Sequence, residues 1–576
     1  MDISSLLASL AARHLPDYDA ARGLLRLRMR TNPHCAPFQE LPDLFATRES
    51  LYFAHLLLHR HRGAPDPRAL RILEEVVAAQ CADGGERDGL WHYYADLDVN
   101  AWPAPDPNWA DFNAMALLLI LHTDGARLPS ALREKVVASV HRAARFVMRR
   151  NVAVGYTNIA LKGAFVTFAA GELTGDAALL AYARERVEKI RRKIVADGRI
   201  AEYLSPTYAG VSLAALAAFD ALVGDAAARA AMREVQHIFW RHILGRFHAP
   251  SGLLAGPHSR AYDAGLGSAR STLGLLLAKL AGERPLRLES RKAEEPLSAI
   301  MGAVLAPDAP AEALADALNP ERRADLIDPA YVENDGLLVT YTTHLEPAFC
   351  LGSVNRHDGW GQRQNIVAYW PVAGGDFGRL GYRTLNDGHA LAAGIVHAAQ
   401  AGGRVLAGVT LAPGRDAHPY ITVSSLTSAQ LGGEIFWEQP DGRMRVRVEG
   451  REAATRAELE LDLAPGALVE LATETHTVHL RLLALVSPSA SAAPMPRLSW
   501  DGTRGRLWMP WHEGAAREFS WDQLAGSRLA FTVGITSDPA APEPAPAEQA
   551  LPADGEWRLA WAGLALALPR VSPVFR

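Results

Sequence analysis

The sequence contains very little cysteine. Only Cys35, Cys81 and Cys350 occur among its 576 residues, and long stretches of chain separate them. An odd number of widely spaced cysteines excludes a disulfide framework and a clustered thiolate site for a metal. Because no other compact ligand motif is present, we expect neither a cofactor nor a catalytic metal, and a structural ion stays open.

The sequence also lacks an excess of charge of either sign. It has 59 lysine and arginine residues against 64 aspartate and glutamate residues, for a formal net charge of −5. Nucleic-acid-binding domains carry a strongly basic surface, so we expect no nucleic acid as a partner. A local basic cleft could still hold a polyanion, and the oligomeric state stays open.

Long apolar runs are absent as well. Spanning a bilayer takes roughly 20 consecutive apolar residues, and no stretch comes near that length. The start of the chain, MDISSLLASL, has neither the basic region nor the long apolar core of a signal peptide. We therefore expect no membrane association and a cytoplasmic location, unless a leader has been removed.

The length predicts more than one domain, because a single core stops growing at about 250–300 residues. Up to residue 285 apolar side chains recur at helical spacing, as Leu161, Phe165 and Phe168 do. Short connections between the helices favour antiparallel neighbours. Residues 1–285 are therefore predicted to form an (α/α) toroid, with a solenoid as the alternative. The predicted helices are 2–14, 44–62, 67–83, 109–123, 128–149, 158–173, 176–196, 206–223, 225–243 and 267–281.

The periodicity then changes from helical to alternating. Residues 286–330 are charged, then rich in alanine and proline, and are expected to be a linker with helical pieces. Met444, Val446 and Val448 alternate with arginines, which is typical of strands with one buried face. Residues 331–576 are therefore predicted to form an antiparallel β-sandwich, so that the chain is an α+β multidomain protein. Strands are expected at 336–343, 347–354, 365–371, 404–411, 419–425, 475–487, 505–510, 527–535 and 556–570.

A polar and aromatic cluster precedes the apolar run of the helix predicted at 109–123. It contains Trp109, Asp111 and Asn113, which are candidates for substrate contact. The same residues have a simpler interpretation. Asn108 could cap the helix, and Asp111 could complement its dipole.

A second candidate stretch is the start of the helix predicted at 206–223. Glu202 and Tyr203 come just before Ser205-Pro206, a pair typical of an N-cap followed by proline in the first turn. Tyr208 therefore lies in the first turn, where the helix dipole favours the phenolate although the reference pKa is about 10. Both tyrosines could instead be packing aromatics.

Two further stretches carry polar and aromatic side chains where packing alone does not require them. The first lies between a glycine-proline pair and an apolar helix, and loops that carry such residues are often functional. The second interrupts the early strands, where aromatic rings could stack on sugars and planar donors could bind a carboxylate, although it could also be a hairpin turn. The residues concerned are His258, Arg260 and Tyr262 in the first stretch and Trp360, Gln362 and Arg363 in the second.

Taken together, these stretches resemble the heparinase II/III and alginate lyase superfamily of polysaccharide lyases. The order of features is similar. Asn158 stands at a helix start, a stretch from Glu202 through Ser-Pro to Tyr208 follows, and a loop with His258 and Arg260 comes later. The resemblance covers most of the chain through short motifs. It implies that Tyr208 is the catalytic tyrosine, that Asn158 neutralises a carboxylate, and that His258 and Arg260 belong to the later histidine-bearing segment. In the simpler interpretation Asn158 or its neighbour only caps its helix.

The resemblance also implies a substrate and a reaction. The substrate is a uronate-containing oligo- or polysaccharide, and the reaction is β-elimination, which begins with loss of the C5 proton. Asn158 and Arg260 are expected to stabilise the developing charge, and Tyr208 to act as base and then as acid. Many of these lyases have a histidine where Ile159 stands here, so the proton chemistry is expected at Tyr208, with His258 assisting.

Two other functions are compatible with the sequence. A toroidal glycoside hydrolase would use two carboxylates around one bond, here Asp111 and Glu202. A non-catalytic carbohydrate-binding protein would hold sugar without cleaving it. Elimination leaves a C4=C5 double bond that absorbs in the near ultraviolet, and hydrolysis does not. The particular uronate, its linkage and the choice between endo and exo cleavage stay open.

Overall fold

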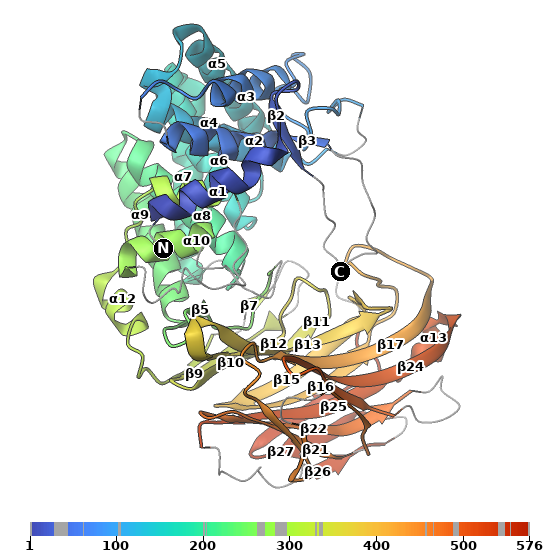
Figure 1. The fold of residues 1–576 in the computed structure, drawn as a ribbon. Coiled ribbons are helices and arrows are strands. Elements are labelled where there is room, and N and C mark those ends of the chain that lie inside the picture. The colour runs from blue at the N-terminus through green and yellow to red at the C-terminus, as the bar shows by residue number, and fades with distance from the viewer. Residues whose placement is uncertain are drawn as a thin grey trace. The chain divides into compact units, whose positions relative to one another are not determined.

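The chain forms two compact units in its computed structural model. Unit 1 comprises Met1–Arg30, Glu40–Gly245 and Gly265–Asp316, and unit 2 comprises Thr31–Gln39, Arg246–Ala264 and Ala317–Arg576. Unit 1 is mainly helical and unit 2 is built of strands, so the α+β multidomain class is confirmed (Figure 1). The residues described are 3–27, 44–60, 63–101, 105–199, 202, 204–261, 271–282, 297–328, 331–332, 338–454, 458–464, 466–487, 495–538, 548–552 and 555–573.

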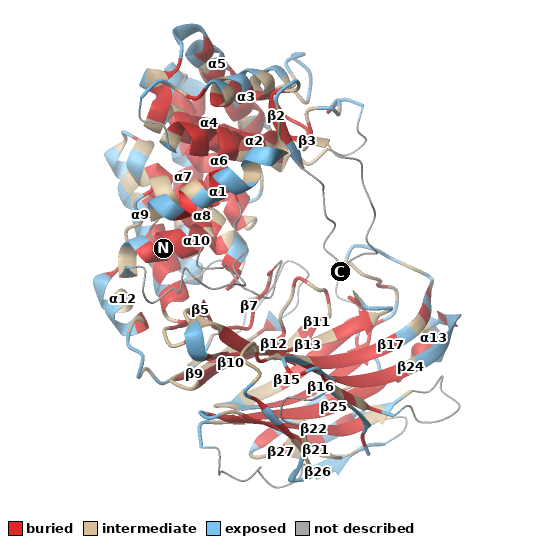
Figure 2. Ribbon diagram, in the orientation of Figure 1, coloured by how far each residue is buried: buried red, intermediate tan, exposed pale blue. Residues whose placement is uncertain are grey.

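The helices of unit 1 are of two kinds. α6 (Thr157–Thr174) and α8 (Pro206–Leu222) are rich in small and apolar residues and are buried on most sides. α5 (Ser130–Arg150) and α7 (Ala177–Asp197) bury one face and expose charged residues on the other, which Figure 2 shows as pale blue against red. Helices that are apolar all round belong inside, and amphipathic helices cover them. The others are α1 (Ile3–His14), α2 (Thr47–Arg60), α3 (Pro67–Ala78), α4 (Asn108–Asp124), α9 (Ala226–Leu244), α10 (Thr272–Ala281), α11 (Ala299–Val304) and α12 (Ala311–Ala317), whose last residue belongs to unit 2.

These helices pack in two layers. In the inner layer α2, α4, α6, α8 and α10 are successive neighbours, and in the outer layer α3, α5, α7 and α9 are. Each inner helix also packs against the helix that follows it in the chain, so helix pairs are the repeating feature. This is the order that an (α/α) array requires, and its closure into a toroid stays a prediction. Among the described helices, none combines the length and the apolar character that crossing a membrane requires.

The predicted helix starts are confirmed at one place and corrected at two. Ser205 caps α8, because its Oγ accepts the backbone N–H of Tyr208 at 3.0 Å. The proposed cap at Asn108 is wrong, since Asn108 is the first residue inside α4 and Pro107 precedes it. A capping role for Asn158 is wrong as well, because α6 begins one residue earlier and no side chain caps it. The polar residues at these two starts therefore have other partners.

Unit 2 contains two large antiparallel sheets. Every strand pair among the described residues is antiparallel, as the alternating sequence pattern predicts. The first sheet has the order β20 (Leu459–Asp462), β23 (Arg497–Trp500), β24 (Arg504–Ser520), β17 (Ser425–Glu438), β13 (Phe377–Asn386), β12 (Ile366–Pro371), β10 (Phe349–Val354), β9 (Tyr341–Glu346) and β6 (Ala324–Ile327). The second has the order β11 (Arg356–Asp358), β15 (Gly394–Ala401), β16 (Arg404–Leu411), β25 (Arg528–Thr536), β22 (Thr477–Val486), β21 (Leu468–Ala472), β18 (Arg445–Val448) and β19 (Arg451–Ala454).

One hydrophobic core draws side chains from both sheets. Leu351, Trp370 and Trp437 belong to the first sheet, and Val409 and Phe531 to the second. Because successive residues of a strand point to opposite faces, every second side chain enters this core. Full burial of such a side chain contributes roughly 1.5–3 kcal/mol. Two sheets with a common core are what a sandwich requires, and that finer classification stays a prediction.

The units do not end where the sequence predicts domain ends, at 285 and 331. Arg246–Ala264 belongs to unit 2, where β4 (Phe247–His248) and β5 (Leu253–Leu254) form a hairpin. Within the predicted linker, α11 packs on helices of unit 1, and β6 pairs with β9 in unit 2. A two-residue strand has no periodic pattern, so the sequence could not separate this excursion from the helices around it.

The strand predicted at 419–425 is a loop. Residues 412–424 connect β16 to β17, and β17 begins only at Ser425. The apolar and β-branched residues of this stretch resemble a strand, but Pro413 and Pro419 have no N–H to donate to a neighbouring strand. We refer to this connection as loop 412–424.

Candidate functional site

The start of α6 holds a carboxylate. Asn158 is the second residue of α6, and its side chain is fully buried, with 0% exposed. Its Nδ2 donates to Oε1 of Glu202 at 2.5 Å, and its backbone N–H donates to Oε2 at 3.2 Å. Unpaired N–H groups and the helix dipole favour an anion at such a position. Two donors of Asn158 therefore converge on one carboxylate of the chain itself.

Tyr208 follows Glu202 across a tightly held turn. Pro206 occupies the first position of α8, and the cap at Ser205 fixes the backbone of Tyr208. Leu204 is buried in the left-handed region, with a φ of 42°. For a residue other than glycine, this backbone conformation costs about 1–3 kcal/mol of free energy, and such strain is often found at functional sites. Tyr208 is half-buried.

The start of α4 is tied to its neighbours through Arg150 at the end of α5. Arg150 donates to Oδ1 of Asn108 at 2.7 Å and to Oδ2 of Asp111 at 3.3 Å. Asn108 in turn donates to the phenol of Tyr156 at 3.3 Å, just before α6. Asp111 is 1% exposed. Burial raises the pKa of Asp111 to about 7, although Arg150 and Lys162 act in the opposite direction.

Aromatic and cationic side chains pack against each other around Trp109 and Phe112 of α4. The guanidinium carbon of Arg48 lies 4.5 Å from the ring centroid of Trp109 and 5.0 Å from that of Phe112. The ammonium of Lys162 lies 3.1 Å from the centroid of Phe112. Lys162 is 1% exposed, and burial together with Arg48 lowers its pKa. Sequence reasoning missed Lys162, although its place four residues after Asn158 puts both on one face of α6.

In unit 2 the two candidate stretches of the sequence lie side by side. The backbones of His258 and Gln364 exchange hydrogen bonds of 3.1 and 2.9 Å, and Arg260 Nε donates to Oε1 of Gln362 at 3.0 Å. His258 itself is buried, with 1% exposed. The stretch approaches β10 so closely that a Cβ at Gly352 would lie 2.0 Å from its backbone. Glycine is therefore required at this crossing.

Trp360 and Arg363 lie in the same cluster. The guanidinium carbon of Arg260 is 5.5 Å from the ring centroid of Trp360. Arg363 and Arg415 pair with the two oxygens of the buried Asp358 at 3.4 and 3.2 Å. Burial alone would raise the pKa of Asp358, but Arg363, His357 and Arg415 together outweigh it and the pKa falls to about 2. The carboxylate therefore stays charged at neutral pH.

The sequence-predicted site residues thus form two groups, one in each unit. Four of them are almost fully buried, namely Asp111 and His258 at 1% exposed and Asn113 and Asn158 at 0% exposed. Tyr203 and Tyr262 lie outside the described residues. Unit 1 holds Trp109, Asp111, Asn113, Asn158, Glu202 and Tyr208, and unit 2 holds His258, Arg260, Trp360, Gln362 and Arg363.

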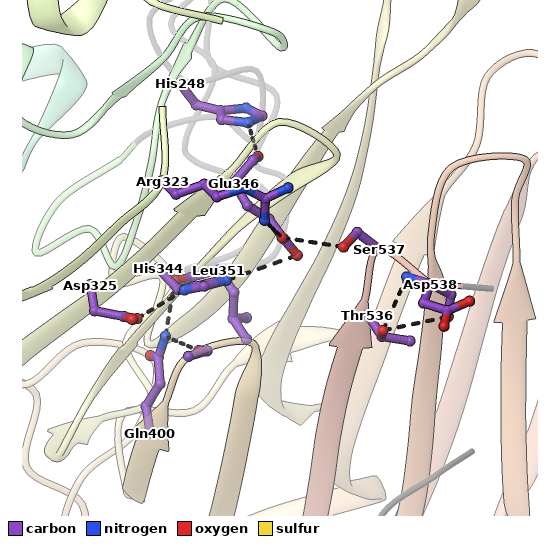
Figure 3. Close-up of polar contacts among 11 residues, drawn as sticks. His248, Arg323, Asp325, His344, Glu346, Leu351, Gln400, Thr536, Ser537 and Asp538 are labelled. Atoms are coloured by element: carbon purple, nitrogen blue, oxygen red, sulfur yellow. Dashed lines mark hydrogen bonds and ion pairs between the residues drawn. The ribbon is translucent and has the colours of Figure 1, made fainter. Parts of the chain in front are cut away.

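A separate polar network joins β6 to β9 in unit 2. Figure 3 shows His344 between Asp325 and the carboxylate of Glu346, which also meets Arg323 and Ser537. Nδ1 of His344 is 2.8 Å from Asp325, and Glu346 accepts hydrogen bonds from Arg323 at 2.5 Å and from Ser537 at 3.3 Å. Burial lowers the pKa of His344, but bonds to Glu346 and Asp325 outweigh it, so the pKa is raised.

Fold and side chains together define a two-unit α+β chain with a carboxylate held at a helix start in unit 1 and an aromatic and cationic cluster in unit 2. A family described as "Domain of unknown function (DUF8769)" matches residues 36–301. No curated protein sequence matches the chain.

Three solved structures are similar to the chain. Heparinase III has 11% identity and a TM-score of 0.44, over 91% of this chain and 83% of that one. A mutant of chondroitin AC lyase from Streptomyces coelicolor A3 has 13% identity and a TM-score of 0.41, over 98% and 85%. A mutant of heparan sulfate lyase HepC from Pedobacter heparinus has 10% identity and a TM-score of 0.35, over 100% and 90%. Because all three TM-scores lie below 0.5, the function proposed below rests on side-chain geometry and on the motifs of the sequence.

Proposed function

We propose that the chain is a lyase that cleaves a uronate-containing polysaccharide or oligosaccharide by β-elimination. Tyr208 removes the proton at C5 of the uronate. The electron pair of the C5–H bond becomes the C4=C5 double bond, the bond from C4 to the glycosidic oxygen breaks, and that oxygen takes the proton from Tyr208. Asn158, Arg260 and His258 hold and neutralise the uronate carboxylate.

The observation that carries this proposal is the carboxylate at the start of α6. Asn158 holds Glu202 through its side-chain amide and its backbone N–H, at 2.5 and 3.2 Å. A uronate carboxylate presents the same two oxygens, so the same donors can receive it in exchange for Glu202. Donors placed where charge develops stabilise the enolate-like intermediate, which is what makes the C5 proton acidic enough to remove.

The position of Tyr208 supports its role as the base. The first turn of a helix lies at the positive end of the helix dipole, which favours the phenolate over the phenol. The cap at Ser205 and the strained backbone of Leu204 fix the turn between Glu202 and Tyr208. A base must lie within hydrogen-bond reach of its proton, so a fixed turn beside the carboxylate site suits this role.

The cluster in unit 2 supports an acidic sugar as the ligand. Arg260 carries a planar guanidinium, a group that matches the two oxygens of a carboxylate. Its guanidinium carbon lies 5.5 Å from the ring centroid of the buried Trp360, which holds the arginine in place.

The experiment is a screen of alginate, polygalacturonate, hyaluronan, chondroitin sulfate and heparan sulfate, followed by near-ultraviolet absorbance and product mass. We expect at least one of them to give an absorbing product whose mass matches elimination. Products without absorbance that have taken up water would replace the lyase with a hydrolase. Binding without any product from the wild type would leave a carbohydrate-binding protein.

The glycoside hydrolase has one observation in its favour. The pKa of Asp111 is raised to about 7, mainly by burial, and hydrolases raise the pKa of their general acid in the same way. Asp111 is paired with Arg150 at 3.3 Å, however, and a carboxyl that neutralises an arginine is a poor general acid. In a hydrolase Asp111→Asn would abolish turnover. In the proposed lyase the variant should retain more than about a tenth of wild-type turnover, because removal of a proton-transfer residue would lower turnover much further.

A further inference from the structure

Loop 412–424 of unit 2 exposes a large aromatic side chain. Tyr420 is 86% exposed, and its neighbour Ile421 is 46% exposed. Single exposed apolar residues are ordinary, but an aromatic and an aliphatic side chain together on a loop indicate a contact surface when the loop is held in place.

The backbone of the loop is held in place by hydrogen bonds. Within it, the N–H of Val423 donates to the carbonyl of Gly414 at 2.9 Å, and that of Ile421 to the carbonyl of His418 at 2.9 Å. From outside, the indole N–H of Trp521 donates to the carbonyl of Val423 at 3.0 Å. The tyrosine is therefore presented by an ordered turn, which lowers the entropic cost of binding a ligand.

A buried ion pair anchors the same loop. Arg415 is 6% exposed and pairs with Asp358, which is 3% exposed, at 3.2 Å. Because the pKa of Asp358 is lowered to about 2 against the effect of burial, this pair is charged at neutral pH. Loop 412–424 is thus attached to the segment that carries Trp360.

A row of side chains leads from Tyr420 back to Arg260. The ring centroids of Tyr420 and His418 are 5.1 Å apart, and those of His418 and Trp360 are 4.7 Å apart. The guanidinium carbon of Arg260 lies 5.5 Å from the ring of Trp360. Burial lowers the pKa of His418, and Arg260 lowers it further, so its imidazole is neutral at pH 7 and can bind a hydroxyl as donor or acceptor.

We propose that Tyr420 and His418, supported from behind by the buried ring of Trp360, form a sugar-binding row that holds a glycan next to Arg260. The ring of Tyr420 covers the apolar C–H face of one sugar, and His418 binds a hydroxyl of the same or the next sugar. The proposal deepens the proposed function, on which it rests for the identity of the ligand as a uronate-containing glycan. It assigns binding, not proton transfer, to Tyr420 and His418, two residues that the sequence motifs leave out.

A sugar fits this surface better than a second protein chain does. A specific protein–protein interface buries at least about 1,000 Å². Two neighbouring exposed side chains on one loop supply only a small part of such an area, but they are enough to cover a sugar ring. The row also continues directly to Arg260, whose guanidinium suits the carboxylate of an acidic sugar.

The test measures binding separately from turnover. Full-length wild type, Tyr420→Ala, Tyr420→Phe and Ile327→Ala are run in native gels that contain alginate, polygalacturonate, hyaluronan, chondroitin sulfate or heparan sulfate. Ile327 is the matched control, because it is a 67% exposed apolar side chain of β6 in the same unit. We expect the polysaccharide that retards the wild type to retard Tyr420→Phe and Ile327→Ala equally, and Tyr420→Ala much less.

Kinetics on the same polysaccharide give the second readout. Loss of one stacking contact of about 1.4 kcal/mol corresponds to tenfold weaker binding, so Tyr420→Ala should raise KM roughly tenfold and leave kcat within about twofold.

Retardation that depends on Tyr420 without any ultraviolet-absorbing product would support the binding row and reject the lyase. Equal retardation and equal KM for Tyr420→Ala and wild type would overturn the row, as would a wild type that none of the five polysaccharides retards. A change of sedimentation coefficient from dimer to monomer in Tyr420→Ala would assign the surface to self-association instead.

Discussion

At the scale of single residues, the side-chain amide of Asn158 has a hydrogen-bond partner at its nitrogen but not at its oxygen among the described residues. Its Nδ2 and backbone N–H bind Glu202, while its Oδ1 is buried without a hydrogen-bond partner among the described residues. A buried polar atom without a partner costs about 1–3 kcal/mol, and native proteins keep few of them. The buried Oδ1 of Asn158 therefore lowers the stability of the fold, which agrees with a role of this residue in binding rather than in packing.

Tyr208→Phe is the most direct test of the chemistry. The variant deletes the hydroxyl and keeps the ring, so we expect thermal stability and substrate binding to change little. General acid–base groups contribute about 10² to 10⁴ in rate, and a residue that serves as both base and acid should lie near the top of that range. The measurement is kcat from ultraviolet absorbance on the polysaccharide that the screen identifies.

The control for this variant is Tyr182→Phe. Tyr182 lies on α7, and its hydroxyl donates to Asn151 at 3.1 Å, away from the residues of the proposed mechanism. It should keep almost all of the wild-type rate. If Tyr208→Phe kept more than about a tenth of turnover, proton transfer at Tyr208 would be rejected, because that loss is too small for such a residue.

Asp111→Asn should change how stability depends on pH. The pKa of Asp111 is raised from its ordinary 3.8 to about 7 in the folded chain, mainly by burial. Between these values the folded state holds a proton that the unfolded state has lost, so stability falls as pH rises, by about 1.4 kcal/mol per unit. We expect urea unfolding of Asp111→Asn to show a shallower fall than wild type between these pH values, and a relative gain in stability above pH ~7.

A solvent-exposed carboxyl provides the comparison for Asp111. Asp462 lies on the exposed edge strand β20, and Asp462→Asn makes the same substitution there, so its pH profile of unfolding is the reference for Asp111→Asn. A profile of Asp111→Asn that coincides with the wild type would mean that Asp111 is ionised in the folded chain, and the raised pKa would be wrong.

At the scale of elements, the sequence predicts best where periodicity and end signals agree. α6 and α8 lie within two residues of the predicted ranges, because an apolar run with a defined start leaves little choice. The end signals alone misled at Asn108 and Asn158, since side chains that could cap a helix bind Arg150 and Glu202 instead. Those partners are distant in sequence, so local capping rules could not reveal them.

His344 on β9 should stabilise unit 2 in acid. Its pKa is raised above its ordinary 6.5 in the folded chain, because bonds to Glu346 and Asp325 outweigh burial. The stabilisation is therefore complete below pH ~6.5 and is lost as pH rises through the folded pKa. His344→Gln should cost about 1.5 kcal/mol in acid, the lower end for a charge-assisted hydrogen bond, and progressively less in alkali.

The control for His344 is His512→Gln on β24. The imidazole of His512 bonds to the backbone carbonyl of Ala515 at 3.2 Å, and its ring centroid lies 5.0 Å from that of Phe519. Urea unfolding of this variant across the pH range is the reference profile for His344→Gln. A loss in His344→Gln that stays constant with pH would show that the imidazole acts by packing and not by its charge.

At the scale of the whole molecule, many candidate residues can be named from the sequence, but the unit to which each belongs cannot. His258 and Arg260 follow α9 in the chain, and yet they belong to unit 2. Arg48 and Lys162 act through aromatic neighbours that only the folded chain supplies, so no local motif marks them. Chemistry-bearing side chains at helix starts and loops could be recognised, whereas their partners depend on long-range packing.

The proposed mechanism assigns Asn158 and Arg260 to the same uronate carboxylate, and a double variant tests this assignment. If both donate to one uronate carboxylate, removing either one weakens the contribution of the other. We expect Asn158→Ala to lower kcat/KM by roughly 10² to 10³, as the loss of one oxyanion donor does. The double variant with Arg260→Ala should deviate from the product of the single effects by about 0.5–3 kcal/mol, the range for residues that share a partner.

The control is Arg404→Ala, at an exposed position of β16. Combined with Asn158→Ala, it should give purely multiplicative effects. Multiplicative effects for Asn158 and Arg260 as well would mean that the two residues do not bind the same carboxylate, and the assignment of Arg260 to the reaction would be wrong.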